Sequence, residues 1–344
     1  MNTSAKLLSI SLISIGLTLT GCASVKGAVK KDKKEIITTA EKSEHDYYQS
    51  AQNALAKERY REAVVALTNI RTFYPTGRYA QQALLDLIYA QYQAKDYESV
   101  TASTAEFIRS YPTSRHADYA LYVQGVTNMD GSPKSSRLIR LNQSERDTSY
   151  LRLAFNDFQN LVNQYPNSVY VPDAVQRMTA LYNHFAYHEL EAARWYIKRD
   201  AHVAAANRAK WVFQYFPQSD QVPEAIAILA HSNAKLGLTD TANEYKTLLQ
   251  INYPQYLNSD GTVKVNSNLG LSYGKKALSA LTFGKFGRAK DAQSYQGSYT
   301  GQTREQLINT ANALQLPPSE SVPTERPQPA QKPRTIGLGL PDNE

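Results

Sequence analysis

Between residues 44 and 254, apolar side chains recur every three or four positions, which is the spacing of one face of an α-helix. In one stretch these side chains are Ala63, Leu67, Ile70 and Phe73. Each such stretch leads to an aromatic residue followed by proline. Because proline cannot continue a helix and pushes the residue before it out of the helical region, each pair should end a helix. The pairs are Tyr74-Pro75, Tyr111-Pro112, Tyr165-Pro166, Phe216-Pro217 and Tyr253-Pro254.

The aromatic-proline pairs mark a longer internal repeat, with spacings of 37, 54, 51 and 37 residues. A small residue lies twelve positions before each proline, and an alanine lies eight positions after each of the first four. Small side chains at these places let helices approach closely. Ser or Gly two residues after the proline should cap the next helix or permit the turn. The marks are Ala63, Val100, Ala154, Ala205 and Ala242; then Ala83, Ala120, Ala174 and Ala225; then Gly77, Ser114, Ser168 and Ser219.

This pattern resembles the tetratricopeptide repeat, a pair of antiparallel helices in which proline closes the second. We therefore expect an all-α fold, a superhelix of about five tetratricopeptide-like helix pairs over residues 44–254, with an ordinary helical bundle as the alternative. The third unit has 17 extra residues near 128–147, which contain Gly, Ser and Pro and should form a loop. The fourth unit has 14 extra residues and no Gly or Pro over 174–198, so its first helix should be longer.

The repeat marks are lost after Pro254. Residues 255–315 carry many Gly, Ser and Asn residues, and residues 316–344 contain seven prolines. A segment of this composition buries too little apolar surface to offset the entropy lost on folding. We therefore expect a largely disordered extension over 255–344, with a short helix from Thr303 to Leu314.

The first 21 residues have the form of a secretory signal. Lys6 precedes an apolar stretch over residues 7–17 that is too short to span a bilayer as a helix. The stretch leads to Leu19-Thr20-Gly21-Cys22, which resembles the bacterial lipobox. This resemblance implies diacylglycerol on the Cys22 sulfur and an acyl chain on its new amino group. An ordinary signal peptide with an incidental cysteine is the alternative, although Cys22 is the only cysteine in the chain.

Several acyl chains hold a protein on a membrane almost permanently. Ala23 stands where enteric bacteria place the aspartate of inner-membrane retention, so the resemblance implies the periplasmic face of the outer membrane. Residues 22–43 would form a lipidated basic tether whose lysines rest on anionic headgroups or only keep a linker soluble. The formal charge is +7, from 38 basic and 31 acidic residues, but the bases are otherwise scattered. We therefore expect no nucleic acid as a partner.

No catalytic constellation is evident, so we expect neither an enzyme nor a cofactor. A lipidated Cys22 leaves no cysteine nucleophile. His184 and His188 have the spacing of two metal ligands on a helix. A third ligand at a suitable spacing is missing, so solvent-facing histidines are expected rather than a metal site. Residues 270–275 are one residue too short for a phosphate-binding loop.

Particular stretches are similar to the BamD family, lipoproteins of the outer-membrane β-barrel assembly (Bam) machine. The similarity covers roughly residues 22–254, and family members stop soon after the fifth repeat, whereas this chain continues for 90 residues. The resemblance implies a lipid-anchored periplasmic scaffold that binds unfolded β-barrel protein segments and docks the barrel-forming subunit to insert proteins into the outer membrane. The similar stretches are residues 81–90, 107–109, 118–122, 125–129, 144–147, 154–158, 165–168 and 203–208.

A step of 37 residues along the expected first helices places amides and aromatic rings in a ladder. Amides can bond to the backbone of an extended peptide, and rings can hold its apolar side chains. The resemblance implies that this half, about 44–130, meets the C-terminal segment of unfolded outer-membrane proteins, although each tyrosine could equally pack helix on helix. The candidates are Tyr48, Gln52, Gln82, Leu85, Tyr89, Tyr92, Tyr119 and Tyr122.

The resemblance implies that residues 147–254 dock the periplasmic domains of a BamA-type barrel subunit, through Asn207 and the ionic anchor Arg208. Arginine suits a bidentate contact with a carboxylate, while a solvated arginine with a local partner is the alternative. Other Bam lipoproteins are further implied partners. The alternative function is a peptidoglycan-associated or division-linked repeat lipoprotein, because the long tail could bind the wall. A cell-wall hydrolase would need a pair of acids that the sequence does not indicate.

Overall fold

The computed structural model describes residues 40–131, 148–265 and 301–318. The chain divides into residues 1–40 and 41–344, and only the second unit is described below. Within the described ranges the regular elements are helices, together with one isolated antiparallel bridge between Leu257 and Val263. The signal segment, Cys22 and most of the basic tether lie outside the described residues.

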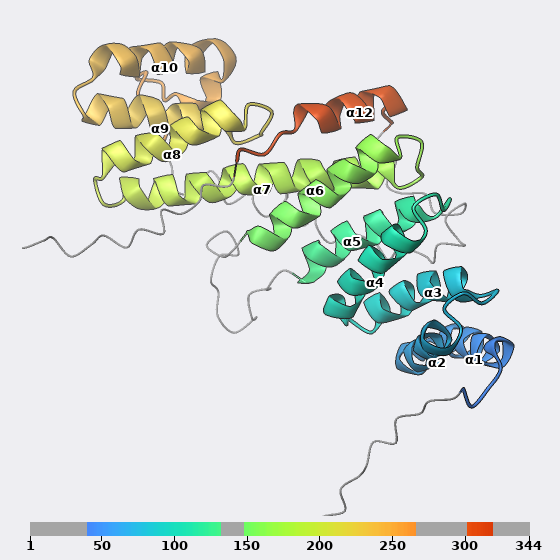
Figure 1. Cartoon of the computed structure of the whole chain (residues 1–344). Coiled ribbons are helices and arrows are strands. Elements are labelled where there is room, and N and C mark those ends of the chain that lie inside the picture. The colour runs from blue at the N-terminus through green and yellow to red at the C-terminus, as the bar shows by residue number, and fades with distance from the viewer. Residues whose placement is uncertain (1–39, 132–147, 266–300, 319–344) are drawn as a thin grey trace, which may run out of the picture. The chain divides into compact units, whose positions relative to one another are not determined.

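The described part of residues 44–252 forms five consecutive helix pairs, and each helix packs against the next along the chain (Figure 1). The expected all-α fold of five helix pairs is therefore confirmed. The first helices are α1 (Glu44–Ala56), α3 (Ala80–Gln93), α5 (Ala117–Gly131), α7 (Val171–Ile197) and α9 (Val222–Lys235), and the second helices are α2 (Tyr60–Phe73), α4 (Tyr97–Ser110), α6 (Ser149–Gln164), α8 (His202–Tyr215) and α10 (Thr239–Asn252).

The aromatic-proline pairs end the second helices as predicted. The five aromatic residues have φ between −143° and −126° and ψ between 49° and 60°, outside the helical region. A following proline disfavours the helical region for the residue before it, which agrees with these angles. The nine small residues that mark the repeat are at most 7% exposed, so they lie where helices approach closely.

The two long units differ in how they use their extra residues. Helix α7 has 27 residues against 14 in α3, which confirms the longer first helix of the fourth unit. In the third unit, α5 continues to Gly131, so residues 128–131 are helical and not part of a loop as expected. The remainder of that expected loop, residues 132–147, lies outside the described residues.

A side chain from each of the first three first helices holds the turn that leads into the next first helix. These side chains, Glu44, Gln81 and Asp118, are 37 residues apart, so one repeat position performs the same task three times. Glycine occupies position 77, where later units have serine, because a Cβ there would lie 2.2 Å from Glu44 Oε1. The bonds are Tyr79 N to Glu44 Oε1 (2.7 Å), Gln81 Nε2 to Ser114 Oγ (2.6 Å) and Ser168 Oγ to Asp118 Oδ2 (2.7 Å).

The serines of these turns bond to backbone amides that precede the next helix. Ser168 Oγ accepts a hydrogen bond from Tyr170 N at 3.2 Å, and Ser219 Oγ accepts one from Gln221 N at 3.1 Å. Helices α7 and α9 begin one residue later, and neither Tyr170 nor Gln221 caps its helix with a side-chain hydrogen bond. The serines therefore shape the turn and do not cap the helix.

The chain beyond Pro254 continues to pack on the repeats. A short 3₁₀ helix, η2 (Pro254–Tyr256), leads to Leu257 and Val263, which pack against the core of α9 and α10. The expected short helix is confirmed as α12 (Arg304–Ala313), which packs against α6 and α7. Residues 301–318 thus belong to the folded unit, a docking that composition alone did not indicate. Residues 266–300 and 319–344 lie outside the described ones.

We predict that Gly125→Ala lowers the free energy of unfolding by about 1–3 kcal/mol, the usual effect of overpacking a core. A Cβ at Gly125 would lie 2.6 Å from Cε1 of Phe158, a fully buried ring of α6. Urea unfolding measures the change. Gly131→Ala is the control, because its Cβ would meet Tyr97 atoms only at 3.7 Å. Equal stability of the two variants would contradict the predicted clash.

Candidate binding surfaces

Asp86 in α3 is hydrogen-bonded to three of the residues predicted to bind a substrate peptide. Its carboxylate accepts hydrogen bonds from Gln52 Nε2 at 2.6 Å, Gln82 Nε2 at 3.2 Å and the Tyr48 hydroxyl at 3.4 Å. Asp86 itself is buried, whereas the three donors are half-buried. The Tyr48 ring stacks on Tyr79, with 4.5 Å between centroids. The ladder of α1 and α3 is therefore organised around a buried carboxylate.

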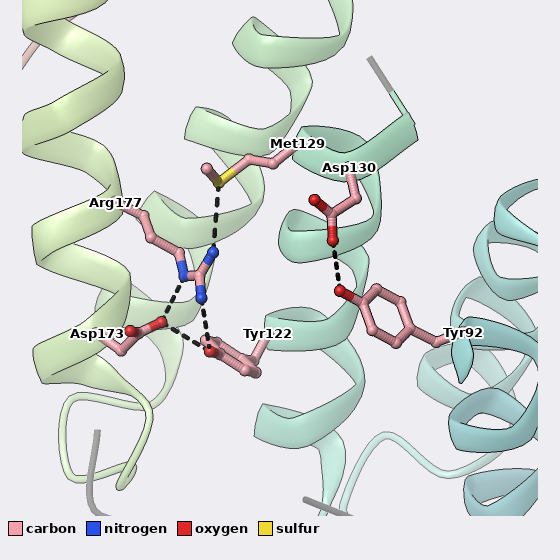
Figure 2. A network of polar contacts seen from close by, with 6 residues as sticks. All are labelled: Tyr92, Tyr122, Met129, Asp130, Asp173 and Arg177. Atoms are coloured by element: carbon pink, nitrogen blue, oxygen red, sulfur yellow. Dashed lines mark hydrogen bonds and ion pairs between the residues drawn. The ribbon is translucent and has the colours of Figure 1, made fainter. Parts of the chain in front are cut away.

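Tyr92 and Tyr89 extend this surface along α3. The Tyr92 hydroxyl donates a hydrogen bond to Asp130 of α5 (Figure 2). Burial and the bond to Asp130 raise the Tyr92 pKa well above its usual range, so this hydroxyl stays a donor. Tyr89 meets Tyr60 of α2 edge to face at 6.1 Å. We call the half-buried set Tyr48, Gln52, Gln82, Tyr89 and Tyr92 the α1–α3 surface.

Tyr122 belongs instead to a buried network between α5 and α7 (Figure 2). Its hydroxyl donates to Asp173 Oδ2 at 2.7 Å, and Arg177 Nε donates to the same oxygen at 2.5 Å. Arg177 Nη2 lies 3.5 Å from the Tyr122 hydroxyl, and Nη1 lies 3.9 Å from Met129 Sδ. Each charged group thus has partners away from water, as buried charges require.

Leu85, Tyr119 and Tyr122 differ from the expectation that they face a peptide. All three are at most 1% exposed, and the Tyr122 ring stacks on Tyr170 at 4.6 Å. All three pack helix on helix, the alternative that the sequence left open for the two tyrosines. We therefore leave them out of the candidate surface.

The acidic partners were missed at the level of sequence, although a signal existed. Tyr48 and Asp86 are 38 residues apart, as are Tyr92 and Asp130. Both separations are close to one 37-residue repeat. A search for a hydrogen-bond donor and a carboxylate one repeat apart on successive first helices would have found both pairs.

Arg208, the predicted ionic anchor, pairs within the chain. Its Nη1 lies 2.9 Å from Glu189 Oε2 of α7, and the two side chains are 41% and 19% exposed. Burial raises the Glu189 pKa, but hydrogen bonds from His188 and Arg208 outweigh it, so the pKa falls below its usual range. Asn207, beside Arg208, is exposed. Arg208 thus has a local partner and still reaches solvent.

His184 is buried, which corrects the expectation that both histidines face solvent. Burial, and to a smaller extent nearby His188, lower its pKa to about 4, so His184 is neutral at pH 7. His188 is half-buried. In the described ranges, no group of three or more His, Cys, Asp or Glu residues is placed to hold a metal. In the same ranges, no helix is long and apolar enough to cross a membrane.

The five helix pairs define a helical-repeat protein. Its half-buried amides and tyrosines and its paired arginine form candidate surfaces for binding other chains. Residues 40–248 match the model of the YfiO family, described as an outer membrane lipoprotein, and the chain belongs to this family. This result confirms the resemblance found in the sequence.

Relatives named "Outer membrane protein assembly factor BamD" align over most of their own length. The protein from Pasteurella multocida is 34% identical over 72% of this chain and 92% of its own. The one from Neisseria meningitidis serogroup A is 35% identical over 71% and 90%. A solved tetratricopeptide repeat protein from Parabacteroides merdae covers 78% of this chain and 98% of its own, with 12% identity and a TM-score of 0.28.

Proposed function

We propose that this protein is an outer-membrane protein assembly factor, a lipid-anchored periplasmic scaffold that receives unfolded β-barrel segments and docks a barrel-forming subunit. The observation that carries the proposal is family membership over residues 40–248. Relatives named as outer membrane protein assembly factors align with the chain over about nine tenths of their own length, which supports the assembly role. Purification from membranes tests the proposal. A large β-barrel protein should co-purify, and recovery with cell-wall sacculi alone would contradict it.

The proposed anchor is Cys22, which would place the repeats on the periplasmic face of the outer membrane. We predict that Cys22→Ala leaves a longer, unprocessed chain that a fatty-acid label does not mark. The reason is chemical, because the thioether forms only on the cysteine sulfur. Ala23→Ser keeps the sulfur and is the control, expected to mature and to take up label. Normal processing and labelling of Cys22→Ala would contradict the proposed lipid anchor.

For substrate binding we propose the α1–α3 surface. Each of its five side chains is half-buried, so part of it is held by the fold while part reaches solvent. A tyrosine ring fixed in this way offers apolar contact at a low cost in entropy, and amides supply polar contacts for an extended segment. The carboxylate of Asp86 keeps Tyr48, Gln52 and Gln82 together, which supports their acting as one site.

For docking of the barrel subunit we propose Asn207 and Arg208. A partner carboxylate would replace Glu189 at the guanidinium of Arg208, or bind beside it. The guanidinium can bind two carboxylates because it has five donors in a fixed fork. The exposed part of Arg208 and the exposed neighbour Asn207 support this role. The proposal requires that the Arg208–Glu189 pair contribute little to folding, as pairs near the surface usually do.

We predict that Arg208→Gln weakens binding to the isolated periplasmic domains of the barrel subunit by about 2 kcal/mol or more, roughly 30-fold in Kd. Glu189→Gln is the matched control, because it breaks the same local ion pair but keeps the guanidinium of Arg208. It should bind at least as tightly as the native chain. Arg208→Glu is less suitable, since it would place a second carboxylate beside Glu189. Equal binding by both variants and the native chain would move the interface elsewhere.

A further inference from the structure

Residues 301–318, here called the docking segment, lie against α6 and α7 (Figure 1). Leu307 and Ala311 lie four residues apart on one face of α12, and Leu314 follows directly after the helix. Each of the three is at most 3% exposed, and Pro317 beyond the helix is also buried. The apolar side of the docking segment is therefore covered by the third and fourth repeat units.

Charged hydrogen bonds join both ends of the docking segment to the repeats. Arg304, the first residue of α12, donates from Nη1 to the carbonyl oxygens of Pro166 at 2.6 Å and Ser168 at 3.2 Å, in the turn between α6 and α7. At the other end, Arg152 of α6 donates from Nη1 to the Pro317 carbonyl at 3.1 Å. Bonds to a charged donor are stronger than neutral ones, so these contacts set the direction and register of the segment.

The Arg152 contact also involves α7. The Arg152 guanidinium lies 5.2 Å from the centroid of the Phe185 ring, and burial lowers the arginine pKa. The docking segment thus begins at the turn that opens α7 and ends beside residues 152 and 185. It runs parallel to α7 and antiparallel to α6. The unusual length of α7 leaves room for this course in addition to its packing with α8 and α9.

The local sequence of the docking segment favours a helix, but it cannot stabilise that helix without the repeats. Thr303 and Gln306 form a capping box, with bonds of 2.8 and 3.3 Å, that satisfies the first free amides. A ten-residue helix is nevertheless marginal in water, so burial against α6 and α7 must supply the remaining stability. Because 35 residues separate positions 265 and 301, the segment stays attached at a high effective concentration when it leaves the surface.

We propose that the face of α6 and α7 is a docking site for a short capped helix followed by proline, and that the docking segment of the same chain is its exchangeable occupant. The pattern that the site recognises is arginine at the first helical position, apolar residues at the fourth, eighth and eleventh, and proline at the fourteenth. A peptide with this pattern competes with the docking segment for the same surface.

A labelled peptide of residues 301–318, titrated into the full chain in detergent and followed by fluorescence anisotropy, tests the proposal. Leu307→Asp with Leu314→Asp should release the docking segment and expose its site. The peptide should bind this released variant at least tenfold more tightly than the native chain. The control, Glu305→Ala with Asn309→Ala, changes exposed positions of the same helix and should behave like the native chain. A peptide with Arg304→Ala should bind the released variant at least fivefold more weakly.

Hydrogen exchange and mass give readouts that do not depend on peptide affinity. Amides 307–313 should be protected in the native chain and exchange freely in the released variant, while α6 and α7 stay folded. Leu307→Ala with Leu314→Ala should give the same result if the charged variant unfolds. Fast exchange at 307–313 in the native chain would overturn the proposal. The mass of the protein in solution distinguishes one chain from two. If the native chain is a dimer and the released variant is a monomer, the docking segment of a second copy occupies the site, and the proposal of exchange within one chain is overturned.

Discussion

Replacing Arg194 with methionine is expected to lower the free energy of unfolding by about 3–5 kcal/mol, because it leaves buried carboxylates without their counter-charge. Arg194 donates from Nε and Nη2 to the two carboxylate oxygens of Glu224, both at 2.6 Å, and from Nη1 to Glu191. The Arg194 and Glu224 side chains are only 5% and 9% exposed. Burial lowers the Arg194 pKa, but the bonds to Glu224 outweigh it and raise the pKa above its usual range.

This ion pair joins α7 to α9, so its loss should loosen the junction between the fourth and fifth units. Arg71→Met is the matched control, because Arg71 and Glu106 also join two helices but are 45% and 29% exposed. Exposed pairs contribute about 0–1 kcal/mol, so this variant should unfold almost as the native chain does. Arg194→Met with Glu224→Leu should recover much of the loss, since no buried charge then lacks a partner on α9. Urea unfolding of the variants gives the comparison, and equal losses for Arg194→Met and Arg71→Met would show that burial does not strengthen this pair.

Asp157→Asn is expected to remove a fall in the free energy of unfolding that the native chain shows as the pH rises from about 4 to 7. Asp157 in α6 accepts hydrogen bonds from Asn128 Nδ2 at 2.6 Å and Gln124 Nε2 at 3.1 Å of α5. Burial raises its pKa from 3.8 to about 6, although the bond from Asn128 opposes this effect. The carboxyl of the folded protein therefore holds its proton more firmly than that of the unfolded chain.

The sign of the pH dependence follows from this difference. Well below pH 3.8 the carboxyl is protonated in both states and does not bias folding. Between the unfolded pKa of 3.8 and the folded pKa of about 6, the folded state binds more protons, so the Asp157 contribution to stability falls as the pH rises. A difference of about two pH units corresponds to about 3 kcal/mol.

The measurement is urea unfolding of the native chain and Asp157→Asn from pH 4 to pH 8. The free energy of unfolding of the variant, relative to that of the native chain, should rise by about 3 kcal/mol across this range and level off above pH 7. Asp240→Asn, at an exposed position of α10, is the control and should change stability by at most about 0.5 kcal/mol. A relative stability of the variant that rises as the pH falls would contradict the predicted direction.

The places where second helices end could be predicted from single residues. Proline restricts its own backbone and that of the residue before it, so Tyr74 and its four counterparts leave the helical region whatever surrounds them. The turns within the units were not predictable in this way. Glu58, Lys95 and Asp200 adopt φ of 56° to 62°, a conformation that favours glycine, and among the four described turns of this kind glycine occurs in the fifth unit, at Gly237. Helix packing on both sides imposes this conformation on the other three residues.

The sequence by itself determined the helix pairs, their small contact residues and the family, because each depends on local rules that repeat along the chain. Only the tertiary structure decided which tyrosines are buried, which carboxylates hold them and what covers α7. Tyr122 and Tyr48 occupy equivalent repeat positions, but Tyr122 is closed in by Asp173 and Arg177 of the long α7, whereas Tyr48 in the first unit stays half-buried. Contacts between residues 30 to 165 positions apart, such as Arg194–Glu224 and Arg152–Pro317, depend on the folded path of the whole chain. No local pattern specifies that path.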